Sequence, residues 1–386
     1  MAKLLEITGK AISGEWGQDD DTGTGIPVLR TTNFTNEGFV NYKNVVTRSI
    51  SKKNIAEKYL RHGDVIIEKS GGSDKQPVGR VIFFEGEENK YLFNNFTGLL
   101  RVQNPEEWLP KYVFYALYTY YRNGGTRAFE NRTTGLHNLQ VDNYVKSVDI
   151  PKLSYRKQQH ICETLDHVRD AVAYRERQLT KLDELIKARF VEMFGDPYTN
   201  SKDYPLKKGE SFFKLSNGKA VPESKRLNGG IPAYGGNGIS WYTDESLFDA
   251  DTIVVGRVGF QSGNVHLVKG PLWVTDNAMY MSSCDFSQYN LTFLIELMAH
   301  VDFTKFQDAG DLKKITQKPF MQFEFLCPPL SLQNQFSAFV AEVDKSKLLV
   351  GSAAAHKPFD IGFFSQKHCA TPCKRGIISS KHVIFH

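Results

Sequence analysis

The chain has 386 residues, of which 41% are hydrophobic and 24% are charged. It is therefore long enough for two or three domains that each bury a core. The formal net charge is +5 and the pI is near 8.7, which permits nucleic-acid binding without requiring it. The five cysteines are scattered and odd in number, and the amino terminus lacks the apolar core of a signal peptide, so we expect a cytoplasmic protein. No run approaches eighteen apolar residues, which excludes a membrane-spanning helix.

Residues 1–150 predict a mixed α+β domain. Short apolar runs typical of β-strands alternate with turn residues there, at positions 26–29, 65–67, 78–84, 91–93, 99–102 and 145–150. One helix interrupts the series at residues 109–123, where Val113, Leu117 and Tyr121 share a face and Pro110 suits the first turn.

The segment from residue 154 to residue 194 contains neither proline nor glycine and predicts one long helix. Its apolar residues recur mostly every three or four positions and form one stripe: Ile161, Leu165, Val168, Val172, Leu179, Leu182, Ile186, Phe190 and Met193. At about 1.5 Å per residue this helix would span about 60 Å, so we expect it to lie against a partner helix or to link separate bodies. Ser154 suits the N-cap, and Gly195 followed by Asp196-Pro197 suits the carboxyl end.

After Pro197 the pattern of the first domain restarts. Strands are expected around Ile231 and at residues 253–255, 265–268, 273–275 and 320–326, with a helix at residues 290–300. A second helix follows at residues 331–350. The chain is thus predicted to consist of a domain at residues 1–150, a helix at 151–197, a second domain at 198–326, a shorter helix at 327–350 and a tail at 351–386.

An internal repeat links the two halves. Its clearest element aligns Pro151-x-Leu153-Ser154-x3-Gln158 with Pro328-x-Leu330-Ser331-x3-Gln335. Three weaker pairs follow the same order: Ile26-Pro27 with Ile231-Pro232, Asp64-Val65-Ile66-Ile67 with Asp251-Thr252-Ile253-Val254, and Leu136-x2-Leu139 with Leu312-x2-Ile315. The repeat predicts two similar units whose helices pair antiparallel, although a duplication without functional meaning stays open.

This order of domains and helices resembles the specificity subunits of type I restriction-modification systems. The strings IPVLRTTNFTNEGF at residues 26–39, SGGSDKQPVGR at 70–80 and LDELIKARFVEMFGDP at 182–197 are similar to strings of that family. The resemblance implies an α+β fold with two target-recognition domains joined by long helices that pack as an antiparallel coiled coil. It also implies a non-catalytic subunit that reads a bipartite target in double-stranded DNA.

The same resemblance implies the partners and cofactors. Two methyltransferase (modification) subunits and the restriction/translocase subunits would assemble on this chain. S-adenosylmethionine, ATP and Mg²⁺ are expected on those partners and none on this chain.

The carboxyl-terminal segment departs from the family. Residues 351–386 carry no helical stripe and are broken by glycine and proline, so we expect a disordered tail; His368, Cys369 and Cys373 lack a second paired motif and make a weak metal site. The second helix would be about half as long as the first. We therefore expect the stripe at Leu179, Leu182, Ile186 and Phe190 to lack an intramolecular partner and to promote self-association.

Candidate DNA contacts lie on loops rich in glycine, hydroxyl, amide and basic residues. Such loops offer backbone amides and charge to phosphates, and arginine, lysine and asparagine can read base edges. For the phosphate backbone the candidates are Lys69, Ser70, Gly71, Gly72, Ser73, Lys75 and Arg80, with Arg257 in the equivalent loop of the second half. For base reading they are Arg30, Thr31, Thr32, Asn33, Arg127, Arg132, Thr133, Thr134, Tyr234, Asn237, Lys313 and Lys314.

Catalytic motifs are weak by comparison. Cys327-Pro328-Pro329-Leu330 lacks the amide or carboxylate that an amino-methyltransferase loop needs, and no phosphate-binding loop of a translocase is present. Asp64, Glu68 and Lys69 lie close together on one expected strand, which is an unconvincing metal-nuclease arrangement. A stand-alone DNA-modifying or DNA-cleaving enzyme and a coiled-coil scaffold without a DNA role remain the alternatives.

Overall fold

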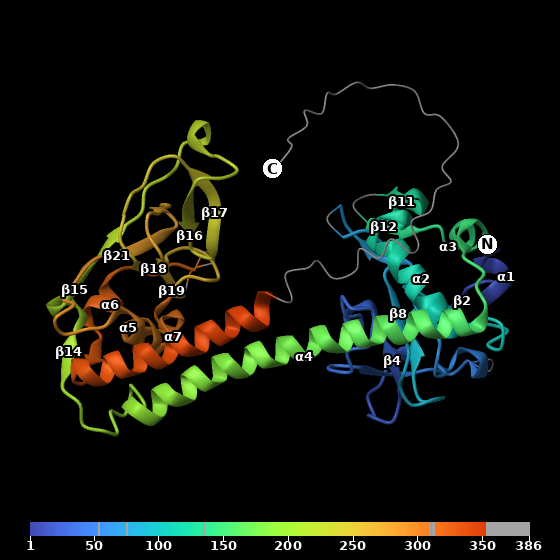
Figure 1. Cartoon of the computed structure of the whole chain (residues 1–386). Helices are drawn as coiled ribbons and strands as arrows, with labels where there is room; N and C mark the ends of the chain where they lie inside the picture. Colours follow the sequence, from blue (N-terminus) through green and yellow to red (C-terminus); the bar gives the residue numbers. More distant parts are fainter. Residues whose placement is uncertain (53–54, 75, 134–135, 309, 311–312, 353–386) are drawn as a thin grey trace. The chain divides into compact units, whose positions relative to one another are not determined.

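The computed structural model describes residues 1–52, 55–74, 76–133, 136–308, 310 and 313–352 (Figure 1). The chain forms two compact units that divide after Ala171, within helix α4 (Tyr155–Phe194). Each unit combines a mixed α+β domain with part of a long helix, which confirms the predicted fold class. Among the described residues no helix combines the length and the apolar composition needed to cross a membrane.

The first domain is layered. Its central antiparallel sheet has the order β2-β10-β6-β8, with β2 (Ile12–Ser13), β6 (Val65–Glu68), β8 (Val81–Phe83) and β10 (Thr97–Leu100). Because side chains alternate along a strand, Val65 and Ile67 face helix α2 (Pro110–Arg122), while Ile66 packs on a second sheet. That sheet has the order β3-β5-β4-β9, with β3 (Gln18–Asp19), β4 (Ile26–Leu29), β5 (Val46–Ser49) and β9 (Leu92–Phe93).

Smaller elements complete the first domain. They are helix α1 (Leu4–Thr8), helix α3 (Val141–Ser147), the pair β1 (Ala2–Lys3) and β13 (Asp149–Ile150), and the sheet β11-β12-β7 with β7 (Ser70–Gly72), β11 (Glu130–Thr133) and β12 (Leu136–Leu139). The strand expected at residues 145–150 is only partly right. The buried residues Tyr144, Val145 and Val148 follow helical spacing, so residues 145–147 belong to α3 and only Asp149–Ile150 is extended.

The second domain repeats this architecture. Its central sheet has the order β15-β21-β18-β19, with β15 (Phe213–Asn217), β18 (Thr252–Gly256), β19 (Val265–Val268) and β21 (Ala278–Cys284). The second sheet has the order β17-β16-β20, with β16 (Ile231–Gly235), β17 (Gly238–Thr243) and β20 (Trp273–Val274). Helix α5 (Leu291–Val301) takes the place of α2, and Asn290 caps it by accepting from the amides of Thr292 and Phe293.

The strand predicted at residues 320–326 is also only partly right. Residues Lys318–Gln322 form the short helix α6, which carries proline in its first turn. Only β22 (Glu324–Leu326) is extended, and it pairs with β14 (Leu206–Lys208).

Strand pairing tests the weaker repeats. Val28 pairs in parallel with Leu92 and Ala233 with Trp273, which confirms the match of Ile26-Pro27 with Ile231-Pro232. Leu139 and Ile315 are also equivalent, because their amides donate to the carbonyls of Lys69 and Arg257; Leu312 lies outside the described residues.

The match of Asp64–Ile67 with Asp251–Val254 is wrong by one residue. Val65 and Ile67 face the helix-side core in the first domain, and Ile253 and Val255 do so in the second. Val65 therefore corresponds to Ile253, not to Thr252. A slip of one residue in a strand exchanges its two faces, and both faces here are apolar, so the sequence pattern could not detect it.

The clearest repeat is also shifted. Buried Gln158 accepts from the amide of Leu109 at 2.8 Å and donates to the carbonyls of Glu107 and Leu153 at 2.9 and 3.0 Å. Gln333 makes the same three bonds in the second domain, with Asn290, Gln288 and Pro328 at 2.8, 2.9 and 2.8 Å. The partner of Gln158 is thus Gln333, two residues before the predicted Gln335.

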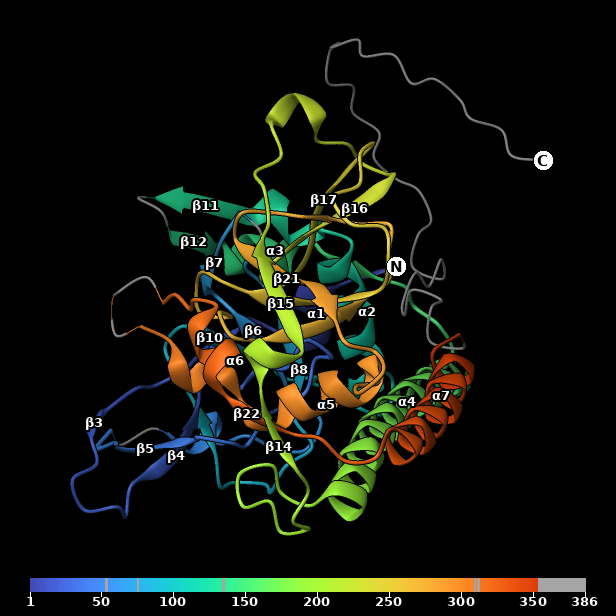
Figure 2. The same ribbon diagram turned by 90° about the vertical axis from the view of Figure 1, so that its left-hand side faces the viewer.

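The two long helices pair antiparallel within the second unit, where α7 (Leu330–Ser352) lies beside the carboxyl-terminal part of α4 (Figure 2). Near one end the rings of Phe190 and Phe336 lie 5.6 Å apart. Further along, Lys347 Nζ lies 2.8 Å from Asp183 Oδ1, and Arg175 Nη1 donates to the carbonyl of Val350 at 3.4 Å. Gly195, with φ of 76°, ends α4 as predicted.

The expectation that the apolar stripe of α4 lacks an intramolecular partner is wrong. Ile186 and Phe190 are 5% and 0% exposed, because an antiparallel partner that starts at residue 330 covers the carboxyl-terminal part of α4 first. Tyr174, Leu348 and Leu349 are exposed toward the other end of the pair, and Leu185 and Val191 are exposed on α4. The tail was predicted at residues 351–386, but Gly351 and Ser352 belong to α7; residues 353–386, with the three possible metal ligands, lie outside the described residues.

Candidate nucleic-acid interface

Two loops leave the central sheets at equivalent positions. After β6 the amide of Lys69 donates to the carbonyl of Phe96 at 2.8 Å, and after β18 the amide of Arg257 donates to the carbonyl of Asn277 at 2.9 Å. Lys69 and Arg257 thus occupy the same place in the two domains. Sequence comparison had paired only the loops, since no string matches across them.

Lys69 is half-buried, and its ammonium donates to the Ser13 hydroxyl at 2.7 Å. Burial lowers the pKa of Lys69 below its ordinary value, and the nearby charge of Lys58 adds to this effect. An anion that approached this edge would oppose both effects and favour the charged form.

The glycine-rich loop of the first domain is less open than predicted. Gly71 is exposed with φ of 119°, a backbone conformation that favours glycine. Gly72 is buried, and a Cβ there would lie 2.5 Å from the amide nitrogen of Val78, so this glycine serves close packing and not phosphate binding. Ser70 is half-buried, and exposed Ser73 accepts from the amide of Gln76 at 3.1 Å.

Arg80 was predicted to contact phosphate, but its guanidinium is already paired. It forms two bonds of 3.0 Å with the Glu68 carboxylate, which is 3% exposed, and a third of 3.2 Å with the carbonyl of Thr31. Although burial opposes the charge, Glu68 raises the pKa of Arg80. Arg80 therefore holds the loops together and its charge is compensated by Glu68.

Asn33 was predicted to read bases, but the structure places it inside the domain. Its side chain is 1% exposed, accepts from the amide of Arg30 and donates to the carbonyls of Asn41 and Lys43. Arg30 is half-buried and donates to the carbonyl of Asn44 at 3.1 Å. Of the predicted residues in this turn, Thr32 is exposed and Thr31 is half-buried.

A hollow of about 720 Å³ lies beside this turn in the first domain. Arg80, Arg122 and Arg127 line it together with the amide side chains of Asn36 and Gln76. Arg127 is exposed, as predicted for a DNA contact, and donates to the carbonyl of Asp74 at 3.3 Å. Arg122 is exposed too; sequence analysis missed it because it falls at the end of an amphipathic helix.

Four further candidates of the first domain lie wholly or in part outside the described residues. Lys75 and Thr134 lie outside the described residues, and so do the side chains of Arg132 and Thr133, whose backbone forms β11.

The candidates of the second domain gather at one edge. Lys314 bridges Val258, and the amide of Gly259 donates to the carbonyl of Lys313 at 2.8 Å, which places both lysines beside the loop that begins at Arg257. Arg257 and Lys313 are half-buried, and Lys314 is exposed.

The turn between β16 and β17 joins the same edge. A Cβ on Gly236 would lie 3.3 Å from the Cα of Gly256, so this turn packs closely against the end of β18. Asn237 is exposed there, and Tyr234 is half-buried against an apolar cluster.

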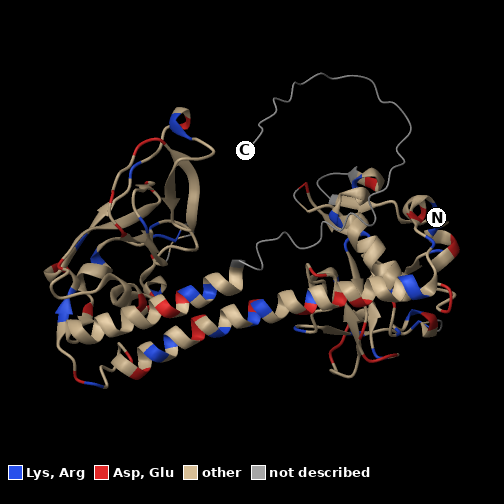
Figure 3. Cartoon of the chain, in the orientation of Figure 1, with Lys and Arg blue, Asp and Glu red and all other residues tan. Residues whose placement is uncertain are grey.

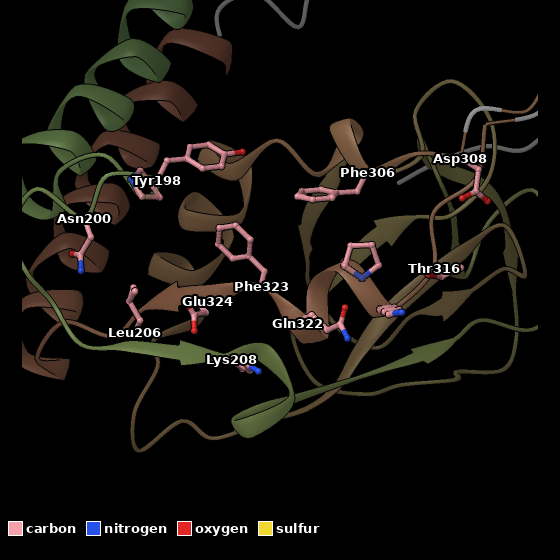
Figure 4. Close-up of a pocket in the computed structure, with 13 residues that line it drawn as sticks. Tyr198, Asn200, Leu206, Lys208, Phe306, Asp308, Thr316, Gln322, Phe323 and Glu324 are labelled. Carbon is pink, nitrogen blue, oxygen red and sulfur yellow. The ribbon is translucent and has the colours of Figure 1, made fainter.

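A second hollow, of about 630 Å³, lies elsewhere in this domain (Figure 4). Aromatic and charged side chains surround it, among them Tyr198, Phe306, Phe323, Lys208 and Glu324. None of the predicted DNA contacts lines it. Among the described residues no group of three His, Cys, Asp or Glu side chains is placed to hold a metal ion.

The carboxylates considered for a nuclease are engaged in ion pairs. Asp64 accepts from Arg101 at 2.8 and 2.6 Å, and Glu68 accepts from Arg80. Both are nearly inaccessible to solvent, so they neutralise internal arginines. Cys327-Pro328-Pro329-Leu330 forms the turn that enters α7, where the amide of Cys327 donates to the carbonyl of Pro205.

Solved structures from type I restriction-modification systems have a similar architecture. The S subunit of a type I restriction-modification system from M. genitalium aligns over 91% of both chains, with a TM-score of 0.57 and 15% sequence identity. The chain has the fold of a type I specificity subunit. A chain from a structure concerned with complex assembly and conformational transition of the type I R-M system aligns over 92% of this chain and 93% of that one, with a TM-score of 0.52 and 13% identity.

Sequence relatives bear the type I specificity-subunit name as well. The specificity subunit of the type I restriction enzyme EcoprrI of Escherichia coli is 22% identical over 113 residues, which cover 29% of this chain and 28% of the relative. A Haemophilus influenzae protein, provisionally named as such a subunit, is 23% identical over 120 residues, or 30% and 31% of the two chains. The matches thus span less than a third of these relatives. No family model matches the chain.

Proposed function

We propose that this chain is the DNA-sequence-recognition subunit of a type I restriction-modification complex. One observation carries the proposal: both domains build the same sheet edge, and both place a basic residue, Lys69 or Arg257, at the same backbone position on it. Further exposed cations flank each edge, Arg122 and Arg127 in the first domain and Lys314 in the second. Duplicated basic edges suit a bipartite target in which each domain reads one half.

The helices support the remainder of this proposal. Helix α4 carries Lys and Arg interspersed with Asp and Glu along its length (Figure 3), which suits a solvated or partner-facing surface more than a DNA-binding one. Two methyltransferase subunits and the restriction/translocase subunits would bind this scaffold. S-adenosylmethionine, ATP and Mg²⁺ would reside on those subunits, and methylation would require the target base to leave the helical stack.

The first experiment is an exchange of domains in the assembled complex. Replacing residues 1–150 with the corresponding domain of another specificity subunit should change one half of the methylated sequence, as read by sequencing methylated sites in cells. Replacing residues 198–326 is the matched exchange and should change the other half. If either exchange altered both halves, the domains would not be independent readers.

The second experiment tests the helices as the spacer. One extra turn between Val172 and Leu182, with a compensating turn after Lys347, which lies opposite Asp183, lengthens the helix pair by about 5 Å, or roughly 1.5 base pairs of B-DNA. The number of bases between the two halves of the methylated site should change. Retained methylation with the original spacing would contradict the proposal that the helices set this distance.

The alternative is an enzyme that acts alone. Incubation of the pure chain with S-adenosylmethionine, Mg²⁺ and DNA separates the two functions. Methylated or cleaved DNA without any partner subunit would contradict the recognition proposal.

A further inference from the structure

Phe260 is the most exposed large hydrophobic side chain in the described part of the molecule, at 88%. It lies in the loop between β18 and β19, three residues after Arg257. Single exposed hydrophobic residues are common, so exposure alone does not indicate a function. The construction of the loop and its surroundings supply the argument.

Backbone bonds hold this loop in one conformation. The amide of Gly256 donates to the carbonyl of Asn264 at 2.9 Å, and the amide of Gly263 donates to the carbonyl of Gly256 at 2.8 Å, so the two ends of the loop are joined. Ser262 is completely buried at its base. The exposed ring thus projects from an anchored loop, and holding it there for a partner costs little further conformational entropy.

A side chain from outside the loop fixes it further. Gln307 Nε2 donates to the carbonyl of Ser262 at 2.6 Å and to the carbonyl of Phe260 itself at 3.3 Å. The amide of Gly259 donates to the carbonyl of Lys313 at 2.8 Å. Gly259, Phe260 and Ser262 therefore all take part in the hydrogen bonds that anchor this loop.

The ring stands on the proposed DNA-binding edge. Arg257 and the lysine pair Lys313 and Lys314 flank the loop. Two acidic residues, Asp276 and Asp308, contact these cations through the backbone: Arg257 donates to the carbonyl of Asp276, and the amide of Asp308 donates to the carbonyl of Lys314.

The first domain has a counterpart built from a different segment. Phe96 is 53% exposed, and its carbonyl accepts from the amide of Lys69, the residue equivalent to Arg257. Each domain thus exposes a phenylalanine close to the same basic position. An aromatic ring beside a cation suits a nucleic acid, because the cation meets a phosphate while the ring stacks on a base.

We propose that Phe260 makes an apolar contact with the bases of the half-site that the second domain reads, by inserting into a base step or stacking on an unstacked base. A phenylalanine inserted in this way stabilises the complex more when the bases of the site unstack easily. It therefore contributes to sequence selection without making hydrogen bonds. This inference rests on the proposed function.

The test uses the assembled complex and a duplex that carries the sequence found methylated in cells. Phe260→Ala should weaken binding to this duplex by about tenfold, which is within the range for loss of one base–aromatic contact. Binding to an unrelated duplex should not change. The slope of log affinity against log salt should also stay the same, since the ring carries no charge. Phe260→Trp, which keeps a stacking ring, should bind nearly as the parent does.

Phe286→Ala is the matched control. Phe286 is 58% exposed in the same domain but lies in the turn that follows β21, away from the basic loop. Its removal should leave both affinities unchanged. Thermal denaturation should show all three variants to be as stable as the parent, because none of them removes a buried side chain.

A second measurement locates the contact. The fluorescence of 2-aminopurine, placed in the half-site of the second domain away from the methylated base, should rise on binding of the parent complex and not of Phe260→Ala. Equal binding and equal fluorescence for the parent and Phe260→Ala would overturn this inference alone. Poorer assembly with the modification subunits, with DNA binding of the assembled fraction unchanged, would also overturn it. If the parent complex binds both duplexes equally well, the proposed function itself is contradicted.

Discussion

The two domains share the same arrangement of sheets and helices, but they stabilise the edge of the central sheet in different ways. In the first domain, Glu68 at the end of β6 binds Arg80, and Arg80 reaches the carbonyl of Thr31 in the neighbouring turn. In the second domain the position of Glu68 is taken by Gly256, which packs directly on Gly236. A charged bridge and a contact between two glycines thus join the same two segments.

The helix junctions differ far less. Gln158 and Gln333 make the same three hydrogen bonds to equivalent backbone groups, and both are completely buried. The comparison shows that the attachment of domain to helix is preserved while the proposed recognition edge varies. This division suits a protein in which the edge determines which DNA is bound and the junction determines how the domain is held.

The largest effect should come from removing the charged bridge. Arg80→Ala leaves the Glu68 carboxylate buried without its partner, which should destabilise the first domain by roughly 3–5 kcal/mol in denaturant unfolding. Lys345→Ala, which breaks an exposed pair with Glu342 on α7, is the control and should cost less than about 1 kcal/mol. Similar losses for the two variants would mean that the bridge of the first domain is dispensable.

The two glutamines should behave alike. Gln158→Ala and Gln333→Ala each leave buried backbone groups without a partner and should each cost roughly 3 kcal/mol, every unsatisfied group contributing about 1–3 kcal/mol. Unfolding of each variant, followed by circular dichroism, measures the loss. A large cost at one position and none at the other would contradict the structural equivalence of the junctions.

A smaller effect is expected at the glycine contact of the second domain. In Gly256→Ala the new Cβ would lie 2.7 Å from the carbonyl oxygen of Gln261 and 2.8 Å from that of Gly236, so the loops must move apart at a cost of about 1–3 kcal/mol. Gly229→Ala is the control, since no atom lies within 4 Å of its new methyl group. Equal stability of the two variants in thermal unfolding would mean that the contact is loose.

The smallest effects concern the exposed cations. Arg127→Ala in the first domain and Lys314→Ala in the second should each weaken DNA binding of the complex a few-fold and reduce the salt slope by about one, as expected for one lost phosphate contact. Lys345→Ala lies on a helix and should leave the slope unchanged. An unchanged slope for either test variant would remove that residue from the proposed interface.

The elements themselves were largely predictable. Helix α4 follows from a long segment without proline or glycine, and α2 and α5 follow from their apolar spacing. The errors fell at residues 145–150 and 320–326, where short apolar runs suit a helix or a strand equally. Among the predicted DNA contacts, Asn33 and Gly72 proved to be internal. Polar turn residues that bind their own backbone resemble recognition residues in the sequence.

The sequence by itself determined the duplication, the order of its elements and the resemblance to type I specificity subunits, because periodicity and short strings are local properties. Only the tertiary structure decided the register of the repeat. Gln333 replaced Gln335 as the partner of Gln158 because a carboxamide must reach a particular amide and two carbonyls. Tertiary structure also decided which charges stay exposed. Arg80 and Arg127 are the same residue type in neighbouring loops, yet only Arg80 meets a buried carboxylate, and that pairing depends on a contact across the sheet.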